Sequence, residues 1–367
     1  MGANFTVKKV LDIFGSEINR NTLLKAEAGG QIPTPERYDT GAIKRRMWTI
    51  ADLPIIGERY GYLKKPQRPL VLSTFTLKGG VLKTTLALNI ARTAALHNIR
   101  TCVIGLDLQG DISGALGLNA DIDESESMES AILKLESPRG LYDFYQGDVT
   151  LDSLLVDTDI PTLKFIPETP ELVQLEKAIS FENRHEEWLK GNVIDVLQSQ
   201  FDLIILDCSP NWNRLVTNAL TACDVLVSPL ECKINNFRNF NVFHKFLRQF
   251  HDGMKLGFET VFVPTRFTST RKLSAEIRNW YHSNVSGCSH GAIRESTAGE
   301  EAVAMRISLP EYAPTSLQAD EMREILVEIW MKVLEAAKKK HKQTEQGIEM
   351  ANPLEAVSTD RVVEAQL

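Results

Sequence analysis

The sequence predicts an α/β protein with a doubly wound, mostly parallel sheet, preceded by a small helical domain with a helix-turn-helix. From residue 70 onward, short runs rich in Val, Ile and Leu alternate with segments of helical periodicity, as in parallel sheets covered by helices. The first of these runs passes through a glycine turn directly into a helix. A chain of 367 residues is also expected to form two domains, because single cores rarely grow beyond about 250–300 residues.

The glycine turn is the most informative stretch of the chain. An apolar run at residues 70–75 precedes Lys-Gly-Gly-Val-Leu-Lys-Thr-Thr at residues 78–85, and a helical pattern follows. Phosphate-binding loops have this order, because glycines let backbone N–H groups point at phosphate oxygens and a helix N-terminus favours anions. Lys83 is expected to reach the phosphates, and the Thr84 hydroxyl to bind Mg²⁺. The predicted nucleotide-contacting residues are Lys78, Gly79, Gly80, Val81, Leu82, Lys83, Thr84 and Thr85.

Two aspartates each end an apolar run. Residues 101–106 are followed by Asp107, and residues 201–206 by Asp207. The carboxyl ends of parallel strands meet at one edge of a sheet, and Asp207 is expected at this edge. Asp207 has the place of a Walker B acid, whose carboxylate holds Mg²⁺ through a water. An aspartate that only caps a strand end is the simpler alternative for both residues.

The front of the chain is predicted to be a small DNA-reading module. Residues 7–14 and 21–28 are two helical segments around a break at Gly15 and Ser16, which is the helix-turn-helix pattern. Residues 1–69 carry a net charge of +5 (twelve Lys and Arg against seven Asp and Glu), whereas the whole chain carries −7 and the remainder therefore −12. A basic front favours contact with nucleic acid. A helical packing or dimerisation domain with a solvated basic face is the alternative.

Composition excludes several classes of protein. No apolar run of about 18 residues and no signal peptide is present, so we expect a cytoplasmic protein without a membrane anchor. The five cysteines have no metal-ligand spacing and are expected to be reduced. The expected boundaries are a DNA-binding domain at 1–63, a proline-containing linker at 64–69, the α/β domain at 70–342, and a polar, disordered tail at 343–367.

The loop with two lysines resembles the deviant Walker A motif of the ParA/MinD ATPases, and nearly the whole chain, roughly residues 4–340, is similar to the longer plasmid-type ParA proteins. The family motif Asp-x-Asp-Pro-Gln-Gly-Asn is matched by Asp107, Gln109 and Gly110, whereas Gly105 replaces the first aspartate. Leu108 stands in place of the proline, and Leu82 in place of a glycine that most members carry. Segments 18–23, 32–35 and 48–53 resemble MerR-type winged helices.

This resemblance implies a weak ATPase that uses ATP and Mg²⁺. Lys78 would cross a homodimer interface to the partner's nucleotide, and Asp107 would position the attacking water. Lys78, Lys83 and Asp107 are thus the expected catalytic residues, with Thr84 and Asp207 at the metal. The replacements at Leu82 and Gly105 bear on the rate of hydrolysis. Assembly of dimers into filaments is a further option.

The resemblance also implies partners. The ATP-bound dimer would bind nucleoid DNA without sequence preference until a ParB-like partner stimulates hydrolysis, and the front domain would repress the protein's own operon. The expected DNA contacts are Arg20, Thr22 and Lys25 in the groove, Arg45 and Arg46 on the wing, and Arg271, Lys272, Arg278 and Arg306 on the α/β domain.

Other functions would require other features of the sequence. A nucleotide-sensing transcriptional repressor that hydrolyses little is the main alternative, and a ParA-type ATPase that carries a protein cluster as cargo is another. A MinD-like membrane ATPase is disfavoured, because residues 343–367 are not a basic amphipathic helix. A nitrogenase-type reductase would need cysteines spaced for a cluster, and this chain has none in such a spacing.

Overall fold

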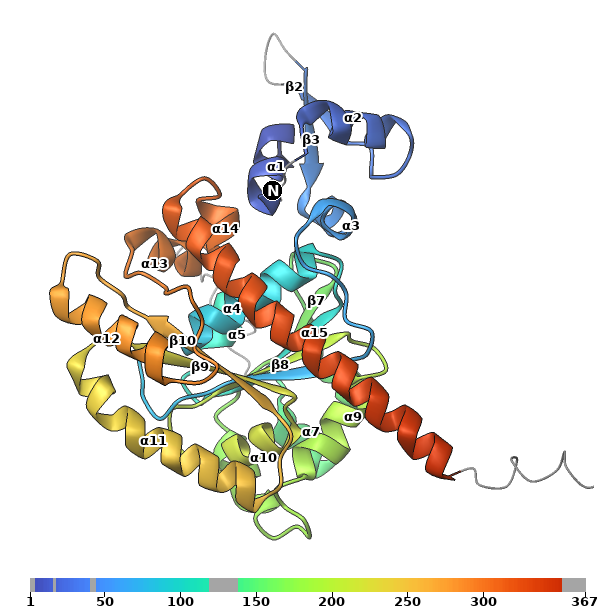
Figure 1. The fold of residues 1–367 in the computed structure, drawn as a ribbon. Helices are drawn as coiled ribbons and strands as arrows, with labels where there is room; N and C mark the ends of the chain where they lie inside the picture. Colours follow the sequence, from blue (N-terminus) through green and yellow to red (C-terminus); the bar gives the residue numbers. More distant parts are fainter. Residues whose placement is uncertain (1–3, 16–17, 40–43, 119–137, 352–367) are drawn as a thin grey trace, which may run out of the picture.

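The structure is a computed structural model that describes residues 4–15, 18–39, 44–118 and 138–351 (Figure 1). The strands are β1 (Asn4–Phe5), β2 (Glu36–Asp39), β3 (Lys44–Thr49), β4 (Leu70–Thr74), β5 (Thr101–Leu106), β6 (Val156–Asp157), β7 (Leu163–Ile166), β8 (Leu203–Cys208), β9 (Val225–Glu231) and β10 (Glu259–Thr265). The α-helices are α1 (Val7–Phe14), α2 (Arg20–Ala28), α3 (Leu53–Tyr60), α4 (Lys83–Leu96), α5 (Asp111–Leu116), α7 (Leu141–Gln146), α8 (Leu172–Ile179), α9 (Asp195–Leu197), α10 (Arg214–Ala222), α11 (Ile234–Gly253), α12 (Lys272–Asn284), α13 (Thr297–Ala304), α14 (Leu309–Tyr312) and α15 (Leu317–Ala351). Short helical turns of other kinds are η1 (Ile50–Asp52), η2 (Leu151–Leu154) and η3 (Lys190–Ile194).

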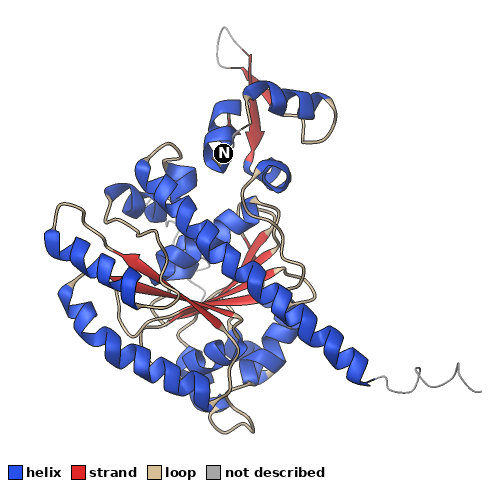
Figure 2. Ribbon diagram, in the orientation of Figure 1, coloured by secondary structure: helices blue, strands red, loops and turns tan. Residues whose placement is uncertain are grey.

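A seven-stranded sheet forms the centre of the larger domain, with helices on both faces (Figure 2). Its order is β10-β9-β4-β8-β5-β7-β6, and every neighbouring pair is parallel except β6 with β7. The predicted doubly wound, mostly parallel sheet is therefore confirmed. Strand β8 lies between β4 and β5, so that Asp207 is paired with Thr74 on one side and with Gly105 on the other.

The strands are apolar throughout because both of their faces are buried. Successive side chains of a strand point to opposite faces. In β5, Val103 joins the core that α4, α5 and α13–α15 cover, whereas Cys102 and Ile104 join the core beneath α7–α12. All six residues of β5 are buried, and so are all six of β8. This explains why runs without polar alternation predicted central strands correctly.

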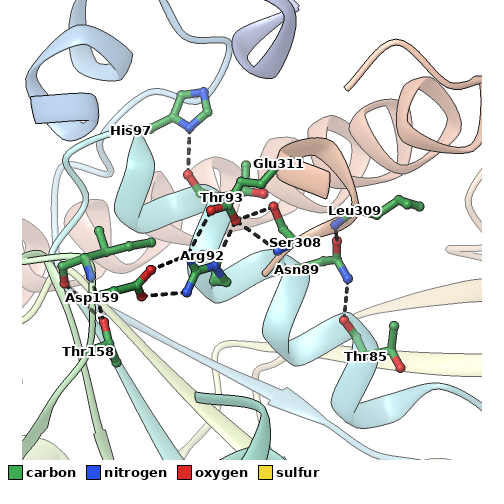
Figure 3. A network of polar contacts seen from close by, with 11 residues as sticks. Thr85, Asn89, Arg92, Thr93, His97, Thr158, Asp159, Ser308, Leu309 and Glu311 are labelled. Carbon is green, nitrogen blue, oxygen red and sulfur yellow. Dashed lines mark hydrogen bonds and ion pairs between the residues drawn. The ribbon is translucent and has the colours of Figure 1, made fainter. Parts of the chain in front are cut away.

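Helix α4 begins at the glycine turn and is tied to its surroundings by buried polar contacts (Figure 3). The Arg92 guanidinium is 2% exposed and donates two hydrogen bonds to Glu311 of α14 and two to Asp159. The Asn89 side chain accepts from the backbone N–H of Leu309 at 2.8 Å and donates to the Thr85 carbonyl. These contacts hold α4 between α14 and the turn before β7.

The N-terminal unit consists of α1, α2, the antiparallel hairpin β2–β3 and α3, with β1 added to the other edge of β3. Thr6 caps α1, and Gly15 ends it in the left-handed conformation at φ 54°. Asn19 caps α2 by accepting from the Thr22 N–H. The two predicted helices are confirmed, whereas Ser16 and residues 40–43 lie outside the described residues.

The N-terminal unit is seated on the larger domain by specific contacts. Arg323 of α15 is 9% exposed and donates to the carbonyls of Asp12 and Ile13 at the end of α1. The Trp330 indole donates to the Lys64 carbonyl at 2.7 Å. A Cβ on Gly57 of α3 would lie 1.9 Å from the Leu96 carbonyl oxygen, so a glycine is required where α3 meets the end of α4.

Helix α15 continues to Ala351. Residues 343–351 of the expected tail thus belong to a helix in the structure, and the rest of that tail lies outside the described residues. None of the described helices is long and apolar enough to cross a membrane.

Candidate nucleotide site

The phosphate loop joins β4 to α4 at the carboxyl edge of the sheet. Gly80 has φ 70°, a left-handed backbone conformation in which a side chain is strained. Leu82 is also left-handed, at φ 74°, directly before the first residue of α4. This is the position at which most members of the resembled family carry glycine, and the backbone geometry gives the reason. The leucine adopts the conformation in spite of its Cβ.

Thr84 and Asp207 meet, as the sequence predicted for a metal site. The Thr84 hydroxyl donates to Asp207 Oδ2 at 2.8 Å, and the Thr74 hydroxyl donates to Oδ1 at 2.6 Å. Asp207 is 1% exposed, and this burial raises its pKa to about 7. A hydroxyl and a carboxylate are oxygen ligands of the kind that Mg²⁺ prefers, so the residues present fit this ion.

Lys83 is the first residue of α4 and is 7% exposed. Its ammonium group donates to the Lys78 carbonyl at 3.3 Å, which places the charge under the loop. Burial lowers the pKa of Lys83, while the carboxylates of Asp207 and Asp107 act in the opposite direction. The three charged groups therefore belong to one site.

Asp107 begins the loop between β5 and α5. Its Oδ1 accepts from the Gln109 N–H at 3.3 Å, which orients the carboxylate. Partial burial raises the pKa of Asp107, whereas the Gln109 N–H and the Lys83 charge lower it. The neighbouring Leu108 is 46% exposed and does not contribute to the core. Asp107 is thus a half-buried acid whose charge interacts with that of Lys83.

Lys78 forms an ion pair with Glu231 of the same chain. Glu231 ends β9, and Lys233 also contacts it, at 3.0 Å. Burial raises the pKa of Glu231, but the hydrogen bonds and charges of Lys78 and Lys233 hold it below its usual value. Lys78 remains 35% exposed. The expected contact of Lys78 with a nucleotide across a dimer interface would involve a second chain. Within one chain, Glu231 is the partner of Lys78.

A small cleft opens beside the loop. It has a volume of about 260 Å³ and is lined by residues including Leu82, Thr85, Arg266, Arg294 and Val303. Arg266 donates to the Gly80 carbonyl at 2.7 Å and to Glu295 at 2.9 Å, so it fixes the outer side of the loop. Sequence reasoning missed Arg266 and Glu231. Each ends an apolar strand with a charge, which is the signal that located Asp107 and Asp207.

Of the N-terminal residues that were expected to contact DNA, only some lie together in the structure. A cleft of about 790 Å³ between α1, α2 and β3 is lined by Arg20, Arg45 and Arg46, and by Lys8, which the sequence reasoning did not single out. Arg46 also forms an ion pair with Glu27 at 2.7 Å. Thr22 and Lys25 do not line this cleft. The Thr22 hydroxyl instead donates to Asn19 at the start of α2.

The remaining expected DNA contacts lie around α12 and after α13. Arg271 and Lys272 begin α12, and the Lys272 side chain is 92% exposed beside Glu276. The Arg278 side chain is fixed by contacts within the chain. It donates to the His290 carbonyl at 2.9 Å, and its guanidinium lies 5.3 Å from the Phe267 ring centre. Arg306 follows α13 in a left-handed conformation. Arg271 and Lys272 are therefore the better candidates for phosphate contact.

All five cysteines are free thiols, and Cys102, Cys208, Cys223 and Cys232 are buried. Cys288 is partly exposed.

Comparisons with known proteins place this site in a family. Residues 70–259, just over half of the chain, match a family described as an AAA domain. The chromosome partitioning protein ParA of Myxococcus xanthus is 31% identical over 156 residues, covering 42% of this chain and 50% of that protein. The chain thus spans about half the length of this relative.

Solved structures agree in fold. A plasmid partition protein from Borrelia burgdorferi aligns with a TM-score of 0.55 at 19% identity, over 72% of this chain and 99% of that one. A cobyrinic acid a,c-diamide synthase from Mycobacterium smegmatis, solved with an ATP analog and magnesium, aligns with a TM-score of 0.51 at 25% identity, over 65% of this chain and 91% of that one.

Proposed function

The chain belongs to the AAA domain family, and from that premise we propose that it is a partition ATPase of the ParA type. The observation that carries the proposal is the meeting of Thr84 and Asp207 at 2.8 Å beside the Lys83 ammonium. A hydroxyl, a carboxylate and a buried lysine at the mouth of a glycine turn are the parts that a nucleoside triphosphate and its metal require.

Each residue has a definable role in hydrolysis. Lys83 and the N–H groups of the loop bind the phosphates, and the cleft beside Leu82 and Thr85 receives the rest of the nucleotide. Thr84 and Asp207 would hold Mg²⁺, which would supply neutralisation of charge on the phosphate oxygens. Asp107 orients the attacking water. Catalysis is thus mainly positioning and charge stabilisation.

Dimer formation depends on Lys78 in this proposal. Lys78 leaves Glu231 and reaches the nucleotide of the second subunit, so that ATP binding and dimerisation are one event. Glu231 keeps Lys233 as a partner at 3.0 Å, so it is not left as an unpaired buried charge. The homodimer is the DNA-binding form.

DNA contact is proposed at two places. The N-terminal unit acts as a MerR-like winged helix that binds an operator, with Lys8, Arg20, Arg45 and Arg46 around its cleft. Arg271, Lys272 and the neighbouring basic residues bind nucleoid DNA through phosphates alone. A ParB-like partner stimulates hydrolysis and releases the dimer. The protein would then act in the cytoplasm, on the nucleoid.

A transcriptional repressor that senses nucleotide is the second candidate. The observation that favours it is Leu82, which adopts a left-handed backbone conformation at the position where most members of the resembled family carry glycine. This replacement bears on the rate of ATP hydrolysis. In that case the basic N-terminal cleft does the main work, and hydrolysis is a minor property.

Turnover and assembly of variants test the proposal. We expect Lys83→Ala to lose ATP binding, because the loop loses its buried phosphate-binding cation. Asp107→Ala should still dimerise with ATP–Mg²⁺ in sedimentation but should lose turnover. Asp148→Ala, which removes an exposed carboxylate, is the matched control and should behave as wild type. Unchanged ATP affinity in Lys83→Ala, or full turnover in Asp107→Ala, would refute the assignment of these residues.

A further inference from the structure

Glu168, two residues beyond the end of β7, occupies the space that a side chain at position 105 would need. A Cβ built on Gly105 lies 1.8 Å from Glu168 Oε2 and 2.6 Å from its Cδ. Any residue larger than glycine would therefore displace this carboxylate. The glycine in β5 is explained by the acid that faces it.

The Glu168 carboxylate holds the start of α5. Its Oε1 accepts from the N–H groups of Ile112 and Ser113, at 3.0 and 3.2 Å. Its Oε2 accepts from the Ser113 hydroxyl at 2.6 Å. The residue in the N-cap position, Gly110, has no side chain and cannot satisfy these donors itself. Glu168 therefore caps α5 from the segment that follows β7.

Burying this acid has an electrostatic cost. Glu168 is 7% exposed, and burial raises its pKa, whereas its hydrogen bonds to Ser113 and Ile112 favour the charged form. Its charge also contributes to the raised pKa of Asp207. A buried acid beside a second buried acid is disfavoured unless its hydrogen bonds are satisfied, and here both oxygens have partners.

The location of Glu168 connects it to the candidate hydrolytic residue. Strand β5 lies between β7 and β8, and Gly105 is paired with Asp207. The loop that carries Asp107 starts at the end of β5 and finishes at the turn that Glu168 caps. This loop is thus fixed at its start by the sheet and at its end by Glu168.

We propose that Glu168 is a positioning residue for ATP hydrolysis. It anchors the first turn of α5 and thereby fixes the position of the Asp107 carboxylate. The inference rests on the proposed ATPase function. In this chain the acid comes from the end of β7, whereas the resembled motif has an aspartate at the position of Gly105 in β5.

Two variants of Glu168 test this role. Glu168→Ala removes the cap, so kcat should fall about 10- to 100-fold while the Kd for ATP stays that of wild type. Amide hydrogen exchange of Ile112 and Ser113 should become faster at the same time. Glu171→Ala is the matched control, because Glu171 lies in the same connection but its side chain does not cap α8. It should leave kcat and exchange unchanged.

Glu168→Gln keeps an oxygen for the two N–H groups but loses the charge, so it should lower kcat less than Glu168→Ala. If Glu168→Ala does not fold, Glu168→Gln decides: lower kcat at unchanged ATP affinity supports the proposal. Wild-type kcat in the variant tested, or a parallel loss of kcat and ATP affinity, overturns it.

A sharper test places a carboxylate in β5, at position 105, and removes that of Glu168. Gly105→Asp alone should be defective, because its side chain would meet Glu168. Combined with Glu168→Ala, it should regain at least part of the lost kcat, because a carboxylate returns to the same space. A double variant no better than Glu168→Ala contradicts the proposal.

The outcomes separate this inference from the proposed function. If wild type shows no ATP turnover, the proposed function fails whatever Glu168 does. If wild type hydrolyses ATP and Glu168→Ala hydrolyses it equally fast, the function stands and only the positioning role is lost.

Discussion

At the scale of single residues, Leu82 shows how this site departs from simpler phosphate loops. Its φ of 74° places a leucine where the backbone favours glycine. Left-handed backbone costs a residue with a Cβ about 1–2 kcal/mol. The side chain is partly buried against the core and lines the cleft beside Thr85, so packing compensates for part of the strain. The substitution therefore changes the cleft wall while the loop keeps its shape.

The strained backbone at position 82 predicts which of two variants at that position is the more stable. Leu82→Gly should be more stable than Leu82→Ala by about 1 kcal/mol, because both lose the packing but only alanine keeps the Cβ. Urea unfolding measures the difference. Gln174, exposed in helix α8, is the control position, where alanine should be the more stable of the two by about 1 kcal/mol. Alanine equal to glycine at position 82 would show that the backbone there is unstrained.

At the scale of elements, helix α4 links the nucleotide site to the N-terminal unit. It begins with Lys83 at the loop and ends where His97 packs against Phe14 and Tyr62. His97 donates through Nδ1 to the Thr93 carbonyl and accepts from the Tyr62 N–H at Nε2, so it is neutral with one defined tautomer. Arg92 and Asn89 hold the middle of the helix (Figure 3). Movement at the loop would therefore reach the N-terminal unit along one rigid element.

The buried His97 predicts a loss of stability in mild acid. Burial lowers its pKa to about 4, whereas the unfolded chain titrates near its ordinary value of 6.5. Between these values the unfolded state binds more protons, so stability falls as pH drops from about 6.5 to about 4, by on the order of 3 kcal/mol in total. Urea unfolding at pH 7.5, 6 and 5 should show a steeper fall for wild type than for His97→Gln. Equal slopes would mean that His97 is not buried in its neutral form.

At the scale of the whole molecule, a basic N-terminal unit sits on an acidic α/β domain. The two are joined by α15, since Arg323 reaches the carbonyls that end α1 and Trp330 reaches the linker. These donors satisfy carbonyl groups at a helix end, which would otherwise need water or another cap. The junction is thus specific and is expected to fix the orientation of the two regions proposed to contact DNA.

Removing Arg323 should loosen this junction. Arg323→Ala leaves the carbonyls of Asp12, Ile13 and Pro314 without their donor. We expect faster tryptic cleavage in the linker around Lys64 and Lys65, with ATP turnover retained. Arg59→Ala is the control, because Arg59 lies on the exposed side of α3 and donates only to Gln31 and Tyr60. An unchanged rate of linker cleavage in Arg323→Ala would show that the units are held together by other contacts.

Local patterns in the sequence were enough to single out most residues of this candidate site. The loop, Asp107 and Asp207 could be found because each directly follows an apolar run. Glu168 could not be assigned, since its role depends on which strands become neighbours. Glu231 ends an apolar strand and could have been noticed, but its pairing with Lys78 is visible only in three dimensions. Residues 343–351 were assigned to the tail because they are polar and carry no apolar period that marks a packed helix, whereas α15 runs to Ala351. Arg278 was expected at DNA, but its contacts with Phe267 and His290 are visible only in three dimensions.

The central claim is that ATP controls binding to DNA. The most direct test measures binding to a duplex of scrambled sequence with ATP–Mg²⁺, with ADP and without nucleotide, over a series of salt concentrations. We predict binding only with ATP–Mg²⁺, with an affinity that falls steeply as salt rises, because phosphate contacts release counterions. Binding that ignores ATP, or that occurs only on one operator sequence, would contradict the partition function and favour the repressor.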